Sequence, residues 1–216
     1  LSFDQKIGAL KPSETILASL RTIGQGAPSG ASSIQQLDLP QVDVPAADPK
    51  ILLALRERGI EAVPVSQNSH FLAVSFFSTD SLRGSDLDLL KNIADQVVAV
   101  NAGHQPLSDS LLQKLEPCLH LMSLRLDRTA ITDRSVPVLA RFKELTSLHL
   151  SGTKISAAGL AQLAPLKKLK RLTLFGIPVS DEDWKKLQTF FPSTQIEGQG
   201  YTVPPLDSDT VEVKPK

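Results

Sequence analysis

A recurrence every 24 residues is the feature that most constrains how this chain can fold. Within residues 97–192, four consecutive segments align without a gap, and each column of the alignment keeps its chemical character. The apolar columns are Val97/Leu121/Leu145/Leu169, Val100/Leu124/Leu148/Leu172, Ala102/Leu126/Leu150/Leu174 and Leu107/Ile131/Ile155/Val179. Apolar columns at a constant offset indicate one structural unit that is repeated four times.

Each repeat is predicted to be a short strand followed by a helix. The Leu-x-Leu part alternates apolar and other residues, which is typical of a strand with one buried face. A Ser or Thr then recurs, and its hydroxyl can accept from the free N–H groups that open a helix. The predicted N-caps are Ser108, Thr132, Ser156 and Ser180. A carboxylate follows at Asp109, Asp133 and Asp181, where the helix dipole favours a negative charge without any bound ligand.

Beyond each N-cap, apolar residues recur at helical spacing. Their columns are Leu112/Val136/Leu160/Trp184, Leu115/Leu139/Leu163/Leu187 and Cys118/Phe142/Leu166/Phe190. Because large apolar side chains fill the rest of its column, Cys118 is predicted to pack in the core and not to act as a nucleophile. Trp184 is predicted to be a core residue for the same reason. Pro137 is expected in the first turn of its helix, where its missing N–H costs little.

A strand and a helix in 24 residues cannot bury their apolar faces alone, so neighbouring repeats must stack. The sequence therefore predicts an α/β fold, a short right-handed leucine-rich-repeat solenoid. Its parallel sheet is expected on the concave side and its helices on the convex side. We expect a leucine-rich-repeat domain over residues 48–198, with an α/β N-terminal cap at 48–96, regular repeats at 97–192 and a truncated strand around Ile196 at 193–198.

The ends of the chain are predicted from weaker patterns. The cap should contain a helix that stops at Gly59 and two strands, near Val63–Val65 and Leu72–Phe76, that pair as a hairpin. Residues 1–47 are expected to form an extension with a short helix at Ser13–Ile23 and a Gly/Ser/Pro-rich linker. Residues 199–216 lack apolar periodicity and are expected to be extended or disordered.

Composition excludes several classes of function. The formal net charge is zero, so nothing calls for a nucleic acid, and no apolar run approaches a membrane span. The chain has one cysteine, and its histidines (His70, His104, His120 and His149) lack neighbouring ligands at metal spacing, so we expect surface histidines and neither metal nor cofactor. No catalytic motif or phosphate-binding loop occurs. The chain is therefore predicted not to be an enzyme, and a hydrolase is the most distant of the alternatives.

The outward strand positions remain as a candidate binding surface, because a rigid sheet holds their side chains in rows. One row is Asn101, Arg125, His149 and Thr173; a second is Ala99, Ser123, Ser147 and Arg171; a third is Gly103, Asp127, Ser151 and Phe175. Residues 121–176 contain ten Lys and Arg but three Asp and Glu, a local excess of seven positive charges. We expect this surface to favour an anionic protein or glycan partner.

The repeat motif Leu-x-x-Leu-x-Leu-x-x-Thr-x-Ile-Thr/Ser-Asp resembles the motif of repeats in planctomycete-type cytochrome c proteins of bacteria. The stretches 2-SFDQKIGAL, 46-AADPKILLALRERGIEAVPVSQ and 71-FLAVSF resemble the segment that links the haem domain to the repeats in those proteins. The resemblance implies that this chain, which starts at Leu1, is the C-terminal part of a longer protein in the periplasm or at the cell surface. That parent would carry a c-type haem domain and a membrane anchor, neither of which occurs in this chain.

Two hypotheses of function follow. In the first, the chain is a monomeric, non-catalytic interaction module that presents its concave face to a protein or glycan partner, without touching the membrane itself. In the second, it is a structural spacer or stabilising appendage of a haem-containing electron-transfer protein and has no ligand of its own.

Overall fold

The structure is a computed structural model that describes residues 39–67, 69–79 and 81–198. The chain divides into two units, Leu1–Leu39 and Pro40–Lys216, and every helix and strand described here belongs to the second unit. The predicted helix at Ser13–Ile23, its linker and the tail at 199–216 lie outside the described residues.

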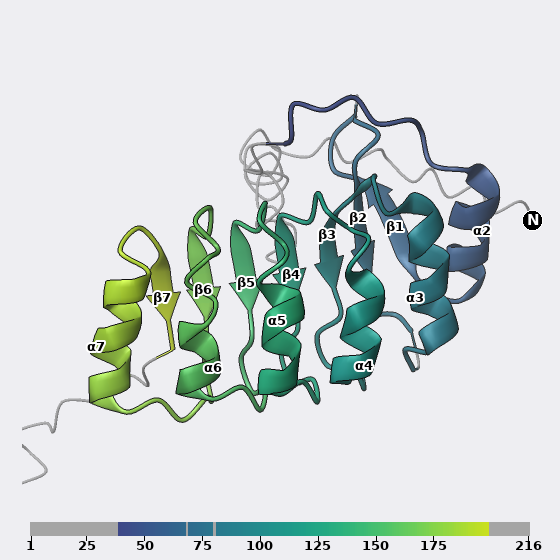
Figure 1. Cartoon of the computed structure of the whole chain (residues 1–216). Coiled ribbons are helices and arrows are strands. Elements are labelled where there is room, and N and C mark those ends of the chain that lie inside the picture. Colours follow the sequence, from purple (N-terminus) through teal and green to yellow (C-terminus); the bar gives the residue numbers. More distant parts are fainter. Residues whose placement is uncertain (1–38, 68, 80, 199–216) are drawn as a thin grey trace, which may run out of the picture. The chain divides into compact units, whose positions relative to one another are not determined.

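Seven strands form one mixed, mostly parallel sheet whose spatial order follows the sequence (Figure 1). They are β1 (Glu61–Pro64), β2 (Leu72–Ser75), β3 (Val97–Asn101), β4 (Ser123–Arg125), β5 (Ser147–His149), β6 (Arg171–Thr173) and β7 (Gln195–Glu197). β1 and β2 are antiparallel, as predicted for the hairpin, and all later neighbours are parallel. The predicted final strand is confirmed, since Ile196 pairs with Leu172. The α/β class is thus confirmed.

The described residues form six α-helices on one side of the sheet (Figure 1). They are α2 (Pro49–Glu57), α3 (Gly84–Leu90), α4 (Asp109–Leu112), α5 (Val136–Leu139), α6 (Ala157–Ala161) and α7 (Asp181–Phe190), with short 3-10 turns at Lys91–Ile93, Gln113–Leu115 and Asp133–Ser135. α2 precedes β1, and the other five lie between successive strands from β2 to β7. α2 is followed by Gly59 in the left-handed region (φ 71°) and then by β1, which confirms the predicted cap elements. Pro137 lies in the first turn of α5, as predicted.

The core lies between the sheet and these helices. Inward strand residues such as Leu124, Leu148 and Leu172 are fully buried, and they share one apolar cluster with helix residues such as Leu139 and Leu163. β4 and β5 show the predicted alternation of buried inward and more exposed outward positions, whereas the predicted outward residues Ala99 of β3 and Thr173 of β6 are buried as well. Cys118 and Trp184 are also buried in this cluster, as predicted. Burial raises the pKa of the Cys118 thiol to about 12, so at neutral pH it is a protonated packing group.

The third helical column fails in the last repeat. Phe190 is 45% exposed, while its neighbour Phe191 is only 4% exposed and joins the core. α7 is ten residues long, whereas α4, α5 and α6 have four or five. Trp184, Leu187 and Phe191 stand at i, i+3 and i+7, which is the spacing of one apolar face of a helix, and Phe190 falls beside that face. The predicted core position of Phe190 is therefore wrong.

All four predicted residues occupy N-cap positions, and three of them make the predicted side-chain hydrogen bond. The side chains of Thr132, Ser156 and Ser180 accept a hydrogen bond from a backbone N–H in the first turn of the following helical segment. Ser108 makes no such bond, because its hydroxyl meets the Ser110 hydroxyl at 3.0 Å instead. Ser108 is the N-cap residue of α4, as predicted, but the predicted capping hydrogen bond of its side chain is not formed.

Candidate binding surface

The strand register aligns the outward side chains of the four regular repeats. Cα partners run from Asn101 through Arg125 and His149 to Thr173, and a second row runs from Ala99 through Ser123 and Ser147 to Arg171. Backbone hydrogen bonds align the third row, which lies beyond the strands. The N–H groups of His104, Arg128 and Gly152 donate at 2.7 Å to the carbonyl groups of Asp127, Ser151 and Phe175, respectively. We call the twelve residues of these three rows the outer sheet face. Their alignment is as the sequence predicts.

Asp127 organises one end of the outer sheet face. Its carboxylate lies 2.7 Å from Arg125 Nε and 3.1 Å from His104 Nε2, and its side chain is largely buried. Gly103, in the neighbouring repeat, makes room for it, because a Cβ on Gly103 would lie only 2.6 Å from Asp127 Oδ1. Asp127 thus fixes the direction of the Arg125 guanidinium, whose side chain remains 53% exposed. His104 was not among the predicted site residues, and the structure adds it.

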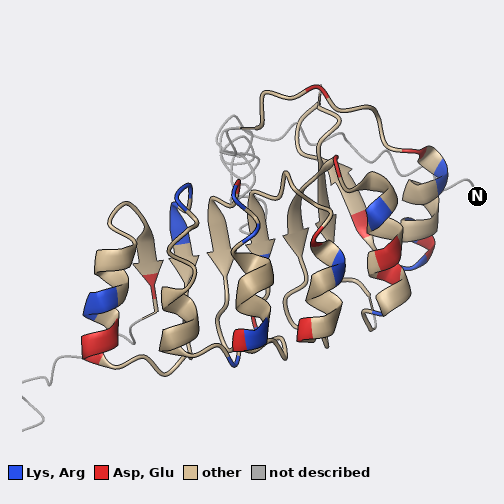
Figure 2. Cartoon of the chain, viewed as in Figure 1, with Lys and Arg blue, Asp and Glu red and all other residues tan. Residues whose placement is uncertain are grey.

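A second arginine lies near the other end. Arg171 Nε is 3.9 Å from Glu197 Oε1, and the same carboxylate oxygen accepts a hydrogen bond from Gln195 Nε2 at 2.9 Å. Each outward arginine therefore faces a carboxylate, and the outer sheet face with Glu197 carries two charges of each sign. Much of the local basic excess lies elsewhere, for instance in the ion pairs Arg141–Glu116 and Lys168–Glu144 (Figure 2). The surface is mixed in charge and not uniformly positive.

His149 lies between these two arginines in the sheet and is neutral near pH 7. Burial lowers its pKa most, followed by the positive charge of Arg125, and Arg171 adds to this, while Asp127 and Glu197 oppose it. Ser147 Oγ lies 3.4 Å from His149 Nε2. The ring can thus offer one donor and one acceptor without a compensating charge.

Several predicted site residues serve the sheet itself. Asn101 Oδ1 accepts from the Gly103 N–H at 3.3 Å, and Ser151 Oγ accepts from the Phe175 N–H at 3.1 Å. Thr173 is only 6% exposed, and its hydroxyl has no hydrogen-bond partner among the described residues. The side chains that remain accessible to a partner are chiefly Arg125, Arg171 and the half-exposed Phe175.

The turn after each strand repeats a left-handed conformation that was not predicted. His104, Arg128, Gly152 and Gly176 stand 24 residues apart and have φ between 55° and 74°. The glycines at 152 and 176, at the repeat distance, carry the signal in the sequence, because glycine adopts positive φ without a Cβ clash. At positions 104 and 128 the sequence carries no such signal, because neither histidine nor arginine marks a left-handed turn.

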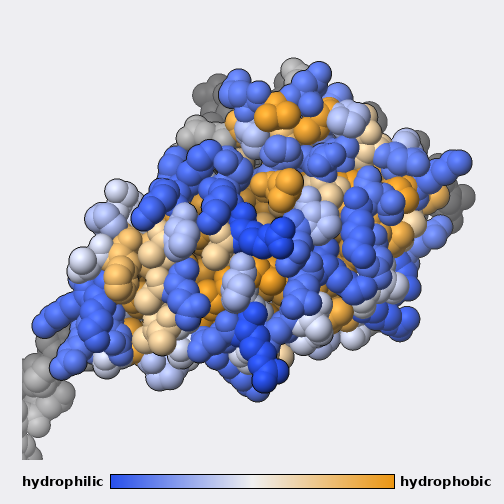
Figure 3. Space-filling model, in the orientation of Figure 1, coloured by the Kyte–Doolittle hydropathy of each residue, from blue (hydrophilic) through white to orange (hydrophobic). Residues whose placement is uncertain are grey.

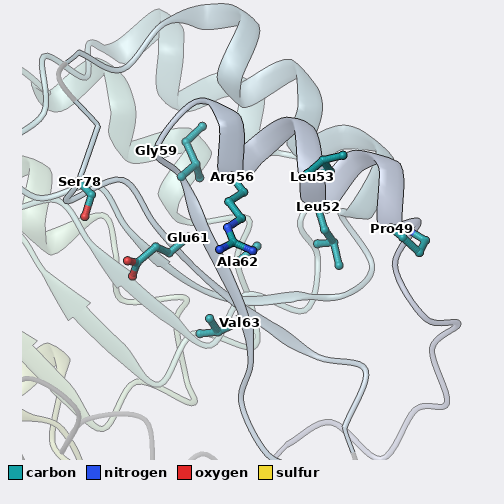
Figure 4. A pocket seen from close by; sticks show the side chains of 10 residues that line it. Pro49, Leu52, Leu53, Arg56, Gly59, Glu61, Ala62, Val63 and Ser78 are labelled. Carbon is teal, nitrogen blue, oxygen red and sulfur yellow. The ribbon is translucent and has the colours of Figure 1, made fainter.

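Other candidate sites in the described part of the chain are few. Within residues 39–67, 69–79 and 81–198, no group of three or more His, Cys, Asp or Glu side chains is placed to hold a metal ion. In the same residues no helix is long and apolar enough to cross a membrane. A pocket of about 710 Å³ lies between α2 and β1, where Arg56 projects towards the strand beside Leu52 and Leu53 (Figure 4). It lies outside the predicted site.

Comparison with known proteins adds no relative: the chain matches no protein-family model, and a search of curated proteins finds no match.

Proposed function

We propose that this chain is a leucine-rich-repeat module that binds a protein or glycan partner through its outer sheet face and performs no catalysis. The 24-residue period, one strand and one helix for each repeat, and the parallel order of the strands support the leucine-rich-repeat assignment. The resemblance to planctomycete-type cytochrome c proteins supports the further proposal that the module belongs to a larger protein of the periplasm or the cell surface.

One observation carries the binding proposal. Arg125 and Arg171 are about half exposed, and the backbone register holds both in fixed rows; Asp127 binds Arg125 at 2.7 Å, and Glu197 lies 3.9 Å from Arg171. Side chains that are ordered before binding lose less conformational freedom when a partner arrives. Arginine is also a residue type that is enriched in protein interfaces.

The test is charge reversal at both positions. We expect Arg125→Glu and Arg171→Glu together to weaken binding of immobilised carboxylate or sulfate polymers at least tenfold, measured by surface plasmon resonance at low salt. A double variant, Lys143→Glu with Lys167→Glu, makes the same change of charge in the exposed turns before β5 and β6 and serves as the control. Equal affinities for all three proteins would refute binding through the outer sheet face.

The second candidate is a spacer or stabilising appendage without a ligand. It is supported by outward side chains that are buried or hydrogen-bonded within the sheet and so are not free to bind a partner. Asn101 and Ser151 bind backbone groups, and Asp127 and Thr173 are buried. In that case, the double arginine variant should assemble into the parent protein normally, whereas deletion of residues 97–198 should impair assembly. The amount of parent protein recovered from cells measures the difference.

A further inference from the structure

The left-handed turn position is occupied by glycine in two repeats but by His104 and Arg128 in the other two. Their φ values are 63° and 55°. Side chains with a Cβ are disfavoured there, histidine less so than most residues, while a long side chain such as arginine is a rarer occupant. Retention of these two side chains at an unfavourable position therefore needs an explanation.

The backbone role of the turn does not supply that explanation. The N–H groups of His104, Arg128 and Gly152 each donate to a carbonyl of the next repeat at 2.7 Å. Gly152 makes this bond as well as the other two residues do. A glycine would thus serve the sheet equally at positions 104 and 128, with less strain.

The two side chains lie at the border of the outer sheet face. His104 Nε2 is 3.1 Å from Asp127, the carboxylate that also holds Arg125. Arg128 Cγ lies next to Gly152, only 3.3 Å from where a Cβ on that glycine would stand. Arg128 is exposed and forms no ion pair with another described residue. The absence of a side chain at Gly152 thus leaves room for the Arg128 side chain beside the next repeat.

We infer that Arg128 and His104 contact the partner, and that the binding surface extends from the outer sheet face across this rim of left-handed turns. The inference rests on the proposed binding function and narrows its partner to a protein segment that carries separate carboxylates beside an apolar side chain. The carboxylates would meet Arg125 and Arg128, and the apolar side chain would cover Phe175.

The mixed charge of the surface favours such a segment over a dense polyanion. Asp127 and Glu197 stand beside the two outward arginines and would repel closely spaced sulfate groups. Phe175 is 50% exposed, and aromatic residues together with arginine are typical of protein interfaces. By contrast, the helix-covered side shows mostly hydrophilic side chains with narrow apolar strips between the helices (Figure 3).

The experiment compares Arg128→Gly and His104→Gly with the unchanged protein. Three immobilised probes are used: a random glutamate–tyrosine copolymer, polyglutamate and heparin. We expect the unchanged protein to bind the copolymer most tightly. Arg128→Gly should weaken that binding at least threefold, while its Tm stays equal or rises by up to about 3 °C because the backbone strain is relieved. Arg128→Lys, which keeps the charge, should retain most of the binding.

The outcomes separate the two proposals. A lower Tm with unchanged copolymer binding would show that Arg128 only packs on Gly152, which overturns the inference. Loss of binding in the Arg125/Arg171 double variant but not in Arg128→Gly and His104→Gly would overturn the rim contact and leave the proposed function intact. Tighter binding to heparin than to the copolymer, or no binding to any probe, would overturn the partner chemistry.

Discussion

Asp109 accepts hydrogen bonds from both the backbone N–H and the hydroxyl of Thr132, the N-cap residue of the next repeat, each at 2.8 Å. Asp133 makes the same pair of bonds to Ser156, at 2.7 Å each. The sequence predicts only that the dipole of the following helix stabilises these negative charges. In the structure the two carboxylates also connect successive repeats. In a stacked array, where each repeat contacts only its neighbours, such bonds stabilise the interface between repeats.

Removal of this connection should destabilise the stack. Asp109 also accepts a hydrogen bond from the Ser135 hydroxyl, so Asp109→Ala leaves three donors of the next repeat without their acceptor. We expect a loss of about 1–3 kcal/mol in the free energy of unfolding, measured by urea denaturation at pH 7. Ser110→Ala, one residue away from the connection, is the control and should change the free energy by less than about 0.5 kcal/mol.

The same variant predicts a dependence on pH. Burial alone would raise the pKa of Asp109, but the hydrogen bonds from Ser135 and Thr132 and the charge of Arg134 outweigh it, and the net pKa is lowered. A carboxyl with a lowered native pKa stabilises the fold above its unfolded pKa of about 4, and this contribution is lost as the pH falls below that value. The gap in stability between the unchanged protein and Asp109→Ala should therefore narrow below about pH 4. A constant gap down to pH 2 would contradict the assignment.

Gly159→Ala should destabilise the unchanged protein but stabilise the Asp133→Ala variant. It occupies the position equivalent to Ser135, and a Cβ there would overlap Asp133 Oδ1. Gly159→Ala must displace the carboxylate that holds Ser156, so we expect a loss of about 1–2 kcal/mol. In an Asp133→Ala background the carboxylate is gone and only Ile155 Cγ2, 3.1 Å from the new Cβ, must yield, so alanine should stabilise α6 by up to about 1 kcal/mol. Thermal unfolding of the four proteins measures this coupling; the same sign in both backgrounds would refute it.

The sequence could predict which residues form the core, because the inward positions of every repeat are occupied by apolar side chains. The columns through Leu124 and Leu139, the hairpin and the strand at Ile196 all follow from that rule. The outward rows followed from strand alternation alone. What could not be predicted depends on contacts between repeats, such as the bridge from His104 to Asp127 and the reach of Asp109 to Thr132. The apolar pattern within one strand or helix does not show which polar side chains of neighbouring repeats come within hydrogen-bond distance.

His149 provides a test of the charges on the outer sheet face. Burial lowers its pKa most, and Arg125 lowers it further, so Arg125→Met should raise the pKa. NMR titration of the imidazole Hε1 signal measures the shift, with Arg141→Met as a control whose arginine pairs with Glu116 instead. Because the native pKa lies below the unfolded value of about 6.5, His149 should also reduce stability progressively as the pH falls below 6.5. An unchanged pKa in Arg125→Met would mean that the guanidinium does not face the ring.

In the last repeat, the structure buries Phe191, whereas the 24-residue period predicts that Phe190 is the buried residue. Phe191 is buried and Phe190 is 45% exposed, because α7 continues past the point where the other helices end. Phe191→Ala should cost about 3–5 kcal/mol through the cavity that it leaves, while Phe190→Ala should cost less than about 1 kcal/mol. Urea denaturation of the two single variants measures both values in the same helix turn. A larger loss for Phe190→Ala would restore the predicted column and require α7 to end one residue earlier.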